Sequence, residues 1–335
     1  MKTRVVILNW NGEEMLRRFL GGVVDSVPTG VEVVVADNGS TDSSCRYVEE
    51  HHPAVRLIRL DRNYGFAEGY NRALGALDGD LFVLLNSDVE TPKGWLEPLV
   101  EAMERDPELG AVAPKLRSWR EREAFEYAGA SGGFIDYLGY PFCRGRILQS
   151  LERDRGQYDD PRDCFWVSGA AFCCRATTFR ALGGFDPRFF AHMEEIDLCW
   201  RMQLQGWRVR VIPQSVVYHV GGATLAVDSP LKIYLNHRNN LRMLFKCASP
   251  GQRLTVAVVR PFTDLLAALS YLMQGRGAAF GAVFRAWRDF LGEHTLLARQ
   301  RHEIRSQRRK NPTGIYRGSM LLRYLFGGRT FGKMM

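Results

Sequence analysis

The sequence lacks the cysteine pattern of a disulfide framework or a zinc ribbon. Its 335 residues include seven cysteines, an odd number, and no two of them form a C-x-x-C pair. No apolar run reaches the roughly 20 uninterrupted residues of a membrane-spanning helix. The nearest run, residues 254–273, contains Arg260, Pro261 and Asp264. These absences favour the reducing cytosol and a protein that does not cross a membrane.

Two common phosphate-binding motifs are absent as well. The sequence has no G-x-x-x-x-G-K-[ST] motif, and no G-x-G-x-x-G motif follows the first apolar run, where Asn9-Trp10-Asn11-Gly12 stands instead. These absences disfavour a P-loop protein and a Rossmann-type dehydrogenase. A nucleotide would have to bind by another scheme.

The composition is that of a folded globular protein, with 46% hydrophobic and 24% charged residues. The charge is divided unevenly. From Ser229 onward there are 19 Lys and Arg against 4 Asp and Glu, a balance of +15, whereas the preceding residues have a balance of −7. We therefore expect two units, residues 1–228 and a basic extension of residues 229–335. The basic unit indicates an anionic partner, either a membrane surface or a nucleic acid.

The first 115 residues alternate short β-branched runs with segments of helical period. Strands are predicted at residues 4–9, 31–37, 55–60 and 80–86, and helices at 13–25, 43–52 and 67–78. The strands are apolar throughout, which is typical of parallel strands covered on both faces. This pattern predicts an α/β fold with a doubly wound, mostly parallel sheet. Ligands of such sheets bind at the carboxyl ends of the strands.

The later part of the chain is less regular. Residues 115–163, rich in Gly, Tyr and Arg, are predicted to form a loop-bearing insertion that covers a site. A helix is expected at 193–207 and a strand at 209–213. Helical spacing then extends from 231 to 297, followed by a basic run at 299–310.

Polar residues follow the second and third predicted strands. Asp37 opens the sequence Asp-Asn-Gly-Ser-Thr-Asp, which suits a turn with a helix cap, but a carboxylate at a strand end also accepts the imide N–H of a pyrimidine or the hydroxyls of a ribose. Asn63, before the next helix, is either a cap or a second contact to the base edge. Asn71 is a candidate for holding that loop.

The sequence Asn86-Ser87-Asp88 ends the most apolar strand. Asp88 either caps a helix or provides an oxygen ligand for a hard divalent cation, with a diphosphate completing the coordination shell. His219, before two glycines, is the second candidate ligand, although a lone histidine near a strand end is more often a satisfied structural residue.

Three acids, Glu194, Glu195 and Asp197, stand at the start of the helix predicted at 193–207. Acids in a first helical turn stabilise the helix dipole. Three of them exceed what capping needs, and one is a candidate general base for a sugar hydroxyl.

Seven motifs occur in one order over residues 3–224 and together resemble the family 2 inverting glycosyltransferases, in particular the rhamnosyltransferase-like branch of cell-surface polysaccharide synthesis. They are VVILNWNG, VVVADNGSTDSS, NYGFAEGYNRAL, LLNSDVE, WVSGAAFCCRA, LGGFDPRFFAHMEEIDLCWR and YHVGGAT. The resemblance implies a GT-A fold in residues 1–228, a nucleotide-diphospho-sugar donor and a divalent cation, Mg²⁺ or Mn²⁺.

The resemblance also implies roles for individual residues. It places Asn9 and Asn11 near the nucleotide and Asp37 at the base. Further candidates on the nucleotide-sugar side are Asn63, Asn71, Asn86 and Ser87. Asp88 matches the second acid of the family's D-x-D motif and His219 a further metal ligand, while Asn86 replaces the first acid. Glu195 matches the catalytic base, but it is one methylene longer than the usual Asp, so the choice among Glu194, Glu195 and Asp197 stays open.

Together, these expectations predict one function. The protein is expected to transfer a sugar from dTDP-rhamnose or a UDP-sugar, with inversion, to a glycan or lipid-linked acceptor. The alternative is an inactive nucleotide-sugar-binding or scaffold protein of the same pathway. No nucleic acid partner is expected, because no nucleic-acid-binding motif accompanies the basic extension. The location expected is the cytoplasm, with the extension either lying on the inner membrane surface or packing on the catalytic unit.

Overall fold

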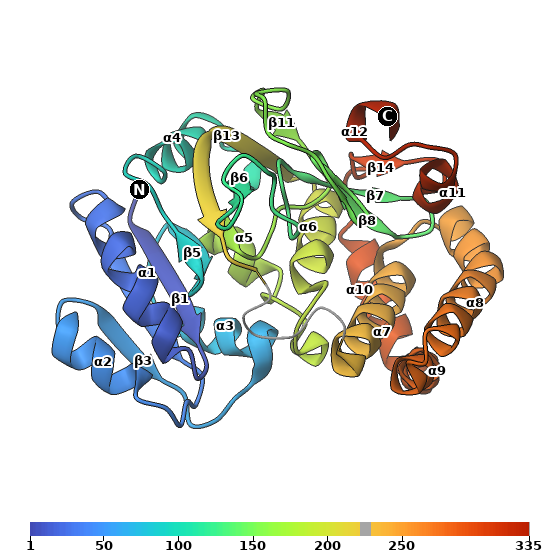
Figure 1. Cartoon of the computed structure of the whole chain (residues 1–335), viewed down its shortest axis with the longest axis horizontal. Helices are drawn as coiled ribbons and strands as arrows, with labels where there is room; N and C mark the ends of the chain where they lie inside the picture. Colours follow the sequence, from blue (N-terminus) through green and yellow to red (C-terminus); the bar gives the residue numbers. More distant parts are fainter. Residues whose placement is uncertain (222–228, 335) are drawn as a thin grey trace.

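The computed structural model describes residues 1–221 and 229–334 (Figure 1). In this part of the chain, nine strands form the main sheet, in the order β11-β13-β6-β12-β4-β1-β2-β3 with β5 paired to β13. Their bounds are β1 Thr3–Asn9, β2 Glu32–Asp37, β3 Arg56–Arg59, β4 Leu81–Asn86, β5 Val89–Glu90, β6 Leu109–Ser118, β11 Arg162–Asp163, β12 Ala171–Arg175 and β13 Arg208–His219.

Strand β1 lies where the chain reverses its direction of travel across the sheet. β1 pairs in parallel with β2 on one side and with β4 on the other, and the chain runs outward to β3 before it returns to β4. The register places Asn9 beside Asp37, and Leu8 beside Asn86. The predicted α/β fold with a mostly parallel sheet is confirmed, and its predicted polar strand ends share one edge.

Helices cover both faces of this sheet and explain the continuous apolar runs of its strands. Val5 packs with Leu16 on one face, whereas Val6 packs with Tyr70 on the other. The helices are α1 Glu13–Ser26, α2 Ser44–His51, α3 Gly65–Gly75, α4 Glu97–Arg105, α5 Ala176–Ala181 and α6 Glu194–Leu204, with a 3₁₀ turn η1 at Pro187–Phe189. The first three lie at the positions that the sequence pattern predicts.

Residues 115–163 differ from the predicted loop-bearing insertion. They complete β6 and then build a second sheet, in the order β10-β9-β8-β7-β14. Its strands are β7 Gly133–Asp136, β8 Pro141–Cys143, β9 Arg146–Ile147, β10 Ser150–Leu151 and, from the C-terminal region, β14 Ile315–Tyr316. Strands of two to four residues are too short to show an alternating pattern, and their apolar partner Phe331 is distant in sequence.

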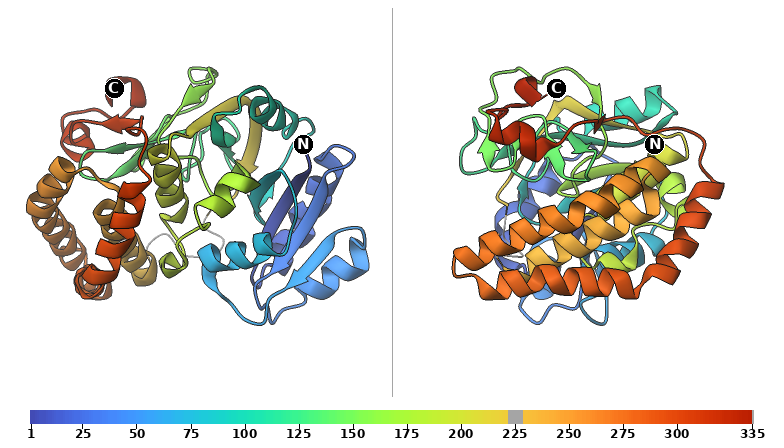
Figure 2. Two further views of the ribbon diagram at one scale, coloured as in Figure 1. Left: turned by 180° about the vertical axis from the view of Figure 1, so that it is seen from behind. Right: turned by 90° about the vertical axis from the view of Figure 1, so that its right-hand side faces the viewer.

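The C-terminal region is mainly helical and lies beside the main sheet (Figures 1 and 2). Its helices are α7 Pro230–Cys247, α8 Pro250–Met273, α9 Gly277–Gly292, α10 His294–Ser306, α11 Met320–Leu325 and α12 Phe331–Met334. The predicted boundary after residue 228 adjoins residues 222–228, which are outside the described residues, as is the end of the YHVGGAT motif. Beyond it, β14 returns to pair with β7.

Helix α8 turns Arg260 and Asp264 inward and most of its large apolar side chains outward. Arg260 and Asp264 are buried, form an ion pair, and bond to Asn240 and Trp287 on neighbouring helices. By length and composition, α8 is the one helix of the described residues that is apolar enough to cross a membrane. Arg260 and Asp264, which interrupt the apolar run, are therefore the residues that hold α8 against its neighbouring helices.

Candidate active site

Asn9 and Asp37 join the ends of β1 and β2. Asn9 is buried, and its Nδ2 donates to Asp37 Oδ1 at 3.0 Å and to Ser44 Oγ at 2.9 Å. The other carboxylate oxygen of Asp37 accepts from the backbone N–H of Ser40 at 3.0 Å. Asn9 Oδ1 is buried and has no hydrogen-bond partner within the described residues. The pair organises the strand ends that the sequence assigns to the nucleotide.

Asn11 links the loops that follow these two strands. Its backbone has a left-handed conformation with φ 49°, and its Oδ1 accepts from the N–H of Thr41 at 2.8 Å. The Asn11 N–H in turn donates to Ser40 Oγ at 2.8 Å. The two loops thus form one polar rim at the sheet edge.

Asn63 and Asn71 hold turns next to α3. Asn63 Oδ1 accepts from Gly65 N at 2.8 Å and from Asn38 Nδ2 at 3.1 Å. Asn71 bonds both the N–H and the C=O of Phe185 at 2.9 Å. Asn38, which sequence reasoning passed over, is buried and also accepts from Tyr64 N. In the structure, Asn63 adjoins the Asp37 loop, whereas Asn71 faces the turn at Phe185.

Asp88 and His219 meet although 131 residues separate them in sequence. Strand β5, directly after Asp88, pairs with the end of β13 and places His219 beside Val89. Asp88 Oδ1 lies 3.1 Å from His219 Nε2, and Asn86 Nδ2 lies 3.4 Å from the same nitrogen. Ser87 Oγ lies beside the Asn9–Gly12 turn, 3.7 Å from the position of a Cβ on Gly12. The structure therefore brings the predicted metal ligands together.

Glu126 completes this cluster and was not found from the sequence. It is buried, and its Oε1 lies 3.3 Å from His219 Nδ1. Burial disfavours the charged imidazole, but Glu126 and Asp88 outweigh it and raise the pKa of His219 to about 10. Burial opposes the charge of Asp88 as well, yet the bond to His219 keeps the pKa of Asp88 below its ordinary value. The three side chains form a charged, buried unit.

The separation of Asp88 and His219 suits two ligands of one divalent cation, which binds histidine in its neutral form. Two adjacent ligands, each about 2.1 Å from an octahedral ion, are about 3.0 Å apart, and the hydrogen-bonded Asp88 Oδ1 and His219 Nε2 are 3.1 Å apart. Among the described residues, no group of three or more His, Cys, Asp or Glu side chains has the arrangement of a metal site. The two side chains therefore do not make a metal site by themselves.

The acids at the start of α6 have three different environments. Asp197 is fully buried and pairs with Arg201 at 2.8 Å and with Lys246 at 2.9 Å. Burial and then the charge of Glu195 raise the pKa of Glu194 well above its ordinary value, and burial raises the pKa of Glu195 to about 7. Glu195 is the partly exposed member of the three. Asp197 is therefore a structural residue whose charge is paired, whereas no cation of the described residues pairs with the carboxylate of Glu194 or Glu195.

The backbone before α6 is held in an unusual conformation. Phe190, His192 and Met193 all have φ between 63° and 71°, a region that residues other than glycine rarely adopt. Asn239 of α7 is buried, and its Nδ2 donates to the carbonyl oxygens of Phe189, Ala191 and His192. Asn239 therefore fixes the turn that positions Glu194 and Glu195, and nothing in the sequence pattern pointed to it.

The start of α6 lies near the end of β4. A Cβ on Gly169 would lie 3.9 Å from the Cβ of Glu195, and the next residue, Ala170, accepts a hydrogen bond from Asn86 N at 3.0 Å. The backbone beside Glu195 is thus bonded to the strand end that precedes Asp88.

Replacing Glu194 by Gln is expected to stabilise the protein more at alkaline than at acidic pH. Because the folded protein raises the pKa of this carboxyl, the unfolded chain binds fewer protons than the folded one above about pH 4.3, the ordinary value of glutamate. The free energy of unfolding of the native protein then falls as pH rises, and glutamine removes this loss.

Urea denaturation at about pH 5 and about pH 8 measures the effect. Glu121→Gln, an exposed change of the same kind, is the control. A difference between wild type and Glu194→Gln that is the same at both pH values contradicts the prediction.

A mostly parallel sheet that reverses at β1, with helices on both faces, is the fold that the chain shares with GT-A glycosyltransferases. The family model for glycosyl transferase family 2 matches residues 4–181, and the chain belongs to this family. The resemblance predicted from the motifs is thereby confirmed.

Two curated relatives of Mycobacterium tuberculosis are similar to the chain. N-acetylglucosaminyl-diphospho-decaprenol L-rhamnosyltransferase is 28% identical over 253 residues, which cover 70% of this chain and 81% of the relative. Pre-mycofactocin glycosyltransferase is 31% identical over 223 residues, 64% of this chain and 42% of the relative.

Solved structures share the fold. GalNAc-T7 with UDP, GalNAc and Mn²⁺ aligns with a TM-score of 0.61 at 18% identity, over 78% of this chain and 50% of that chain. S. aureus TarS 1–349 with UDP-GlcNAc aligns with a TM-score of 0.56 at 16% identity, over 92% and 88%.

Proposed function

We propose that the protein transfers a sugar with inversion from a nucleotide-diphospho-sugar, with dTDP-rhamnose or a UDP-sugar favoured, to a hydroxyl of a lipid-linked or glycan acceptor in cell-surface polysaccharide synthesis. The observation that carries this proposal is the meeting of Asp88 and His219, 3.1 Å apart, at the end of β4, to which the backbone beside Glu195 is hydrogen-bonded. The rhamnosyltransferase relative, whose name contains a diphospho-decaprenol, supports the sugar and the acceptor class.

Asp88 and His219 would hold a divalent cation, which supplies positive charge against the diphosphate of the donor. Asn9, Asn11 and Asp37 order the rim on which the nucleotide would rest, and Ser87 lies beside it. A GT-A structure with Mn²⁺ and UDP among the neighbours supports a cation of this kind.

Glu195 would act as the general base. Its raised pKa, about 7, makes its carboxylate a stronger base than an ordinary glutamate, and about half of the molecules carry the carboxylate form at neutral pH. The carboxylate takes the proton of the acceptor hydroxyl, and the oxygen attacks the anomeric carbon on the face opposite the leaving nucleoside diphosphate. A single displacement inverts that carbon.

A transfer and hydrolysis assay with a panel of UDP-, dTDP- and GDP-sugars tests the proposal. We expect turnover of one donor only in the presence of Mg²⁺ or Mn²⁺. Binding of a donor without turnover under any condition would favour the alternative, an inactive nucleotide-sugar-binding protein.

We also propose that the C-terminal helices lie on the cytoplasmic face of an anionic membrane. Eight apolar side chains on α8 are 40–83% exposed: Leu254, Val258, Phe262, Leu265, Leu266, Leu269, Leu272 and Met273. Leu322 and Leu325 of α11 are exposed too, and Figure 1 places both helices at one edge, which the right-hand view of Figure 2 faces. An apolar helix face beside a strongly basic region is typical of interfacial binding.

Replacing Phe262 and Leu266 by Glu is expected to reduce binding to anionic vesicles at least about tenfold, because each buried side chain of this size contributes about 1.5–3 kcal/mol. Vesicle flotation measures binding, and salt should weaken it, since the Debye length falls to about 3 Å at 1 M. Leu151→Glu, an exposed apolar residue on β10, is the control. Equal binding of both variants and the wild type contradicts the proposal.

A further inference from the structure

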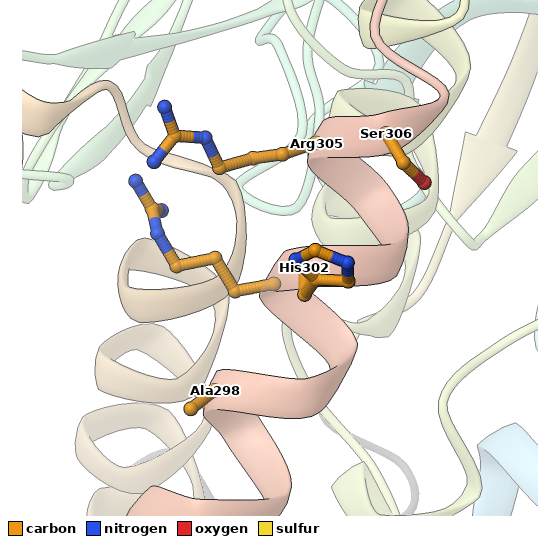
Figure 3. Close-up of a pocket in the computed structure, with 5 residues that line it drawn as sticks. Ala298, His302, Arg305 and Ser306 are labelled. Atoms are coloured by element: carbon orange, nitrogen blue, oxygen red, sulfur yellow. The ribbon is translucent and has the colours of Figure 1, made fainter.

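A surface pocket of about 380 Å³ lies along α10 (Figure 3), and no residue of the candidate active site lines it. It is lined by Ala298, Arg301, His302, Arg305 and Ser306. Figure 3 shows Arg305 extending from α10 toward the neighbouring helix. None of the lining side chains is acidic.

Arg301 is close to three further arginines, and none of the four pairs with a carboxylate of the described residues. Arg253 at the start of α8, Arg301 and Arg305 on α10, and Arg308 after it make no ion pair with a carboxylate in residues 1–221 and 229–334. Arg301 is buried, and burial followed by the charges of Arg253, Arg305 and Arg308 lowers its pKa to about 10. Mutual repulsion of this kind is what an anion would relieve.

Arg301, which lines the pocket, has N–H donors that make no hydrogen bond within the described residues. Arg301 donates only through Nη1, to the carbonyl oxygens of Phe245 at 3.0 Å, Lys246 at 3.3 Å and Ala248 at 2.8 Å, at the end of α7. This fixes the guanidinium in place. Within the described part of the chain, its Nε and Nη2 make no hydrogen bond, although a guanidinium has five N–H donors.

The pocket is separate from the catalytic end of α6. Three residues after α10, Arg309 N donates to the carbonyl of Leu204, at the C-terminal end of α6, at 2.7 Å. Glu194 and Glu195 are at the other end of this 11-residue helix, about 16 Å from Leu204 along its axis, and neither of them lines the pocket. An anion here would not be the donor diphosphate.

We propose that this pocket is a second anion site, which binds the phosphate group of an anionic lipid headgroup or of a soluble phosphoester. Planar guanidinium groups with free N–H donors match phosphate oxygens in geometry and charge. The site goes beyond the proposed glycosyl transfer and does not depend on it.

Arg305→Glu tests the site, with Arg299→Glu as the matched control. Arg299 is on the same helix and makes the same change of charge, but it pairs with Glu303 and does not line the pocket. The probes are inorganic pyrophosphate in EDTA, followed by calorimetry, and vesicles of phosphatidylcholine with or without phosphatidylglycerol, followed by sedimentation. Any pyrophosphate bound at the active site contributes equally to both variants.

We expect Arg305→Glu to weaken binding of one probe at least about tenfold and Arg299→Glu to weaken it less than about twofold. A loss confined to phosphatidylglycerol vesicles assigns the site to a lipid headgroup, and a loss for pyrophosphate assigns it to a soluble phosphoester. If the two variants bind both probes equally, the proposal is wrong. Sugar transfer to a soluble acceptor does not involve Arg305. If the protein transfers no sugar, that result therefore contradicts the proposed function and not the anion site.

Discussion

Replacing Asp88 by Asn is expected to lower sugar transfer by about a thousandfold or more, which is about 4 kcal/mol of transition-state stabilisation. Asparagine keeps the size of the side chain and a hydrogen bond to His219, but it removes the charge that would hold a divalent cation against the leaving diphosphate. Initial rates at saturating Mg²⁺ or Mn²⁺ measure the loss. EDTA should produce the same loss in the wild type, and added metal should reverse it.

Glu90→Gln is the matched control, because Glu90 is the next acid along the chain and pairs with Arg122 instead of His219. Its transfer rate should stay close to that of the wild type. Calorimetry should also show weaker donor binding in the presence of metal for Asp88→Asn only. Full activity of Asp88→Asn, or of the wild type in chelator, is incompatible with metal-assisted departure of the diphosphate.

The part of the fold that was predictable from the sequence is the part built by local patterns. The runs around Val6 and Val34 are apolar on both faces, and the helices between them have regular spacing, so the parallel sheet and its polar edge follow from short windows. The second sheet does not, because its strands pair over large distances in sequence: Ile135 lies beside Ile315.

The same contrast separates the site residues. Asp88 and His219 stand at the ends of strands, which makes each a candidate on its own. Glu126 follows no strand signal, and it becomes part of the cluster only because the chain folds it against His219. Asn239 is on a helix of the basic extension and acts on a turn about 50 residues earlier. Such contacts depend on the tertiary fold and produce no periodic pattern in the sequence.

Helix α8 shows how composition alone misleads about orientation. Packing of the basic extension on the catalytic unit is one of the two alternatives that the sequence leaves open, and an apolar run alone would favour its apolar side chains at the contact. Arg260 is instead 1% exposed and Leu266 is 66% exposed, because Asp264, Asn240 and a backbone carbonyl satisfy the guanidinium inside. A buried ion pair with several hydrogen bonds can determine which face of a helix turns inward.

Replacing Glu195 by Gln is expected to lower transfer about a hundred- to ten-thousandfold, the usual contribution of a general base, while leaving donor affinity near that of the wild type. Glutamine has nearly the same shape, so the start of α6 should stay intact, but it cannot accept the proton of the acceptor hydroxyl. Single-turnover rates measure the loss, and calorimetry with the intact donor measures affinity. The matched controls are Glu194→Gln, one residue earlier, and Asp197→Asn, whose carboxylate pairs with Arg201 and Lys246.

The pH profile gives a readout that a structural role of Glu195 would not produce. Because its pKa is raised to about 7, the carboxylate form is lost as pH falls, and kcat/KM of the wild type should drop to about a tenth of its plateau at about pH 6. The variant Glu195→Gln should lack this acidic limb, whereas Glu194→Gln should retain one. Asp197→Asn should lower the stability of the protein more than its rate of transfer, since it leaves Lys246 buried with one carboxylate partner fewer. If Glu195→Gln transfers at the wild-type rate with an unchanged acidic limb, the base is another group, and Glu194 is the remaining uncompensated carboxylate at this end of α6 within the described residues.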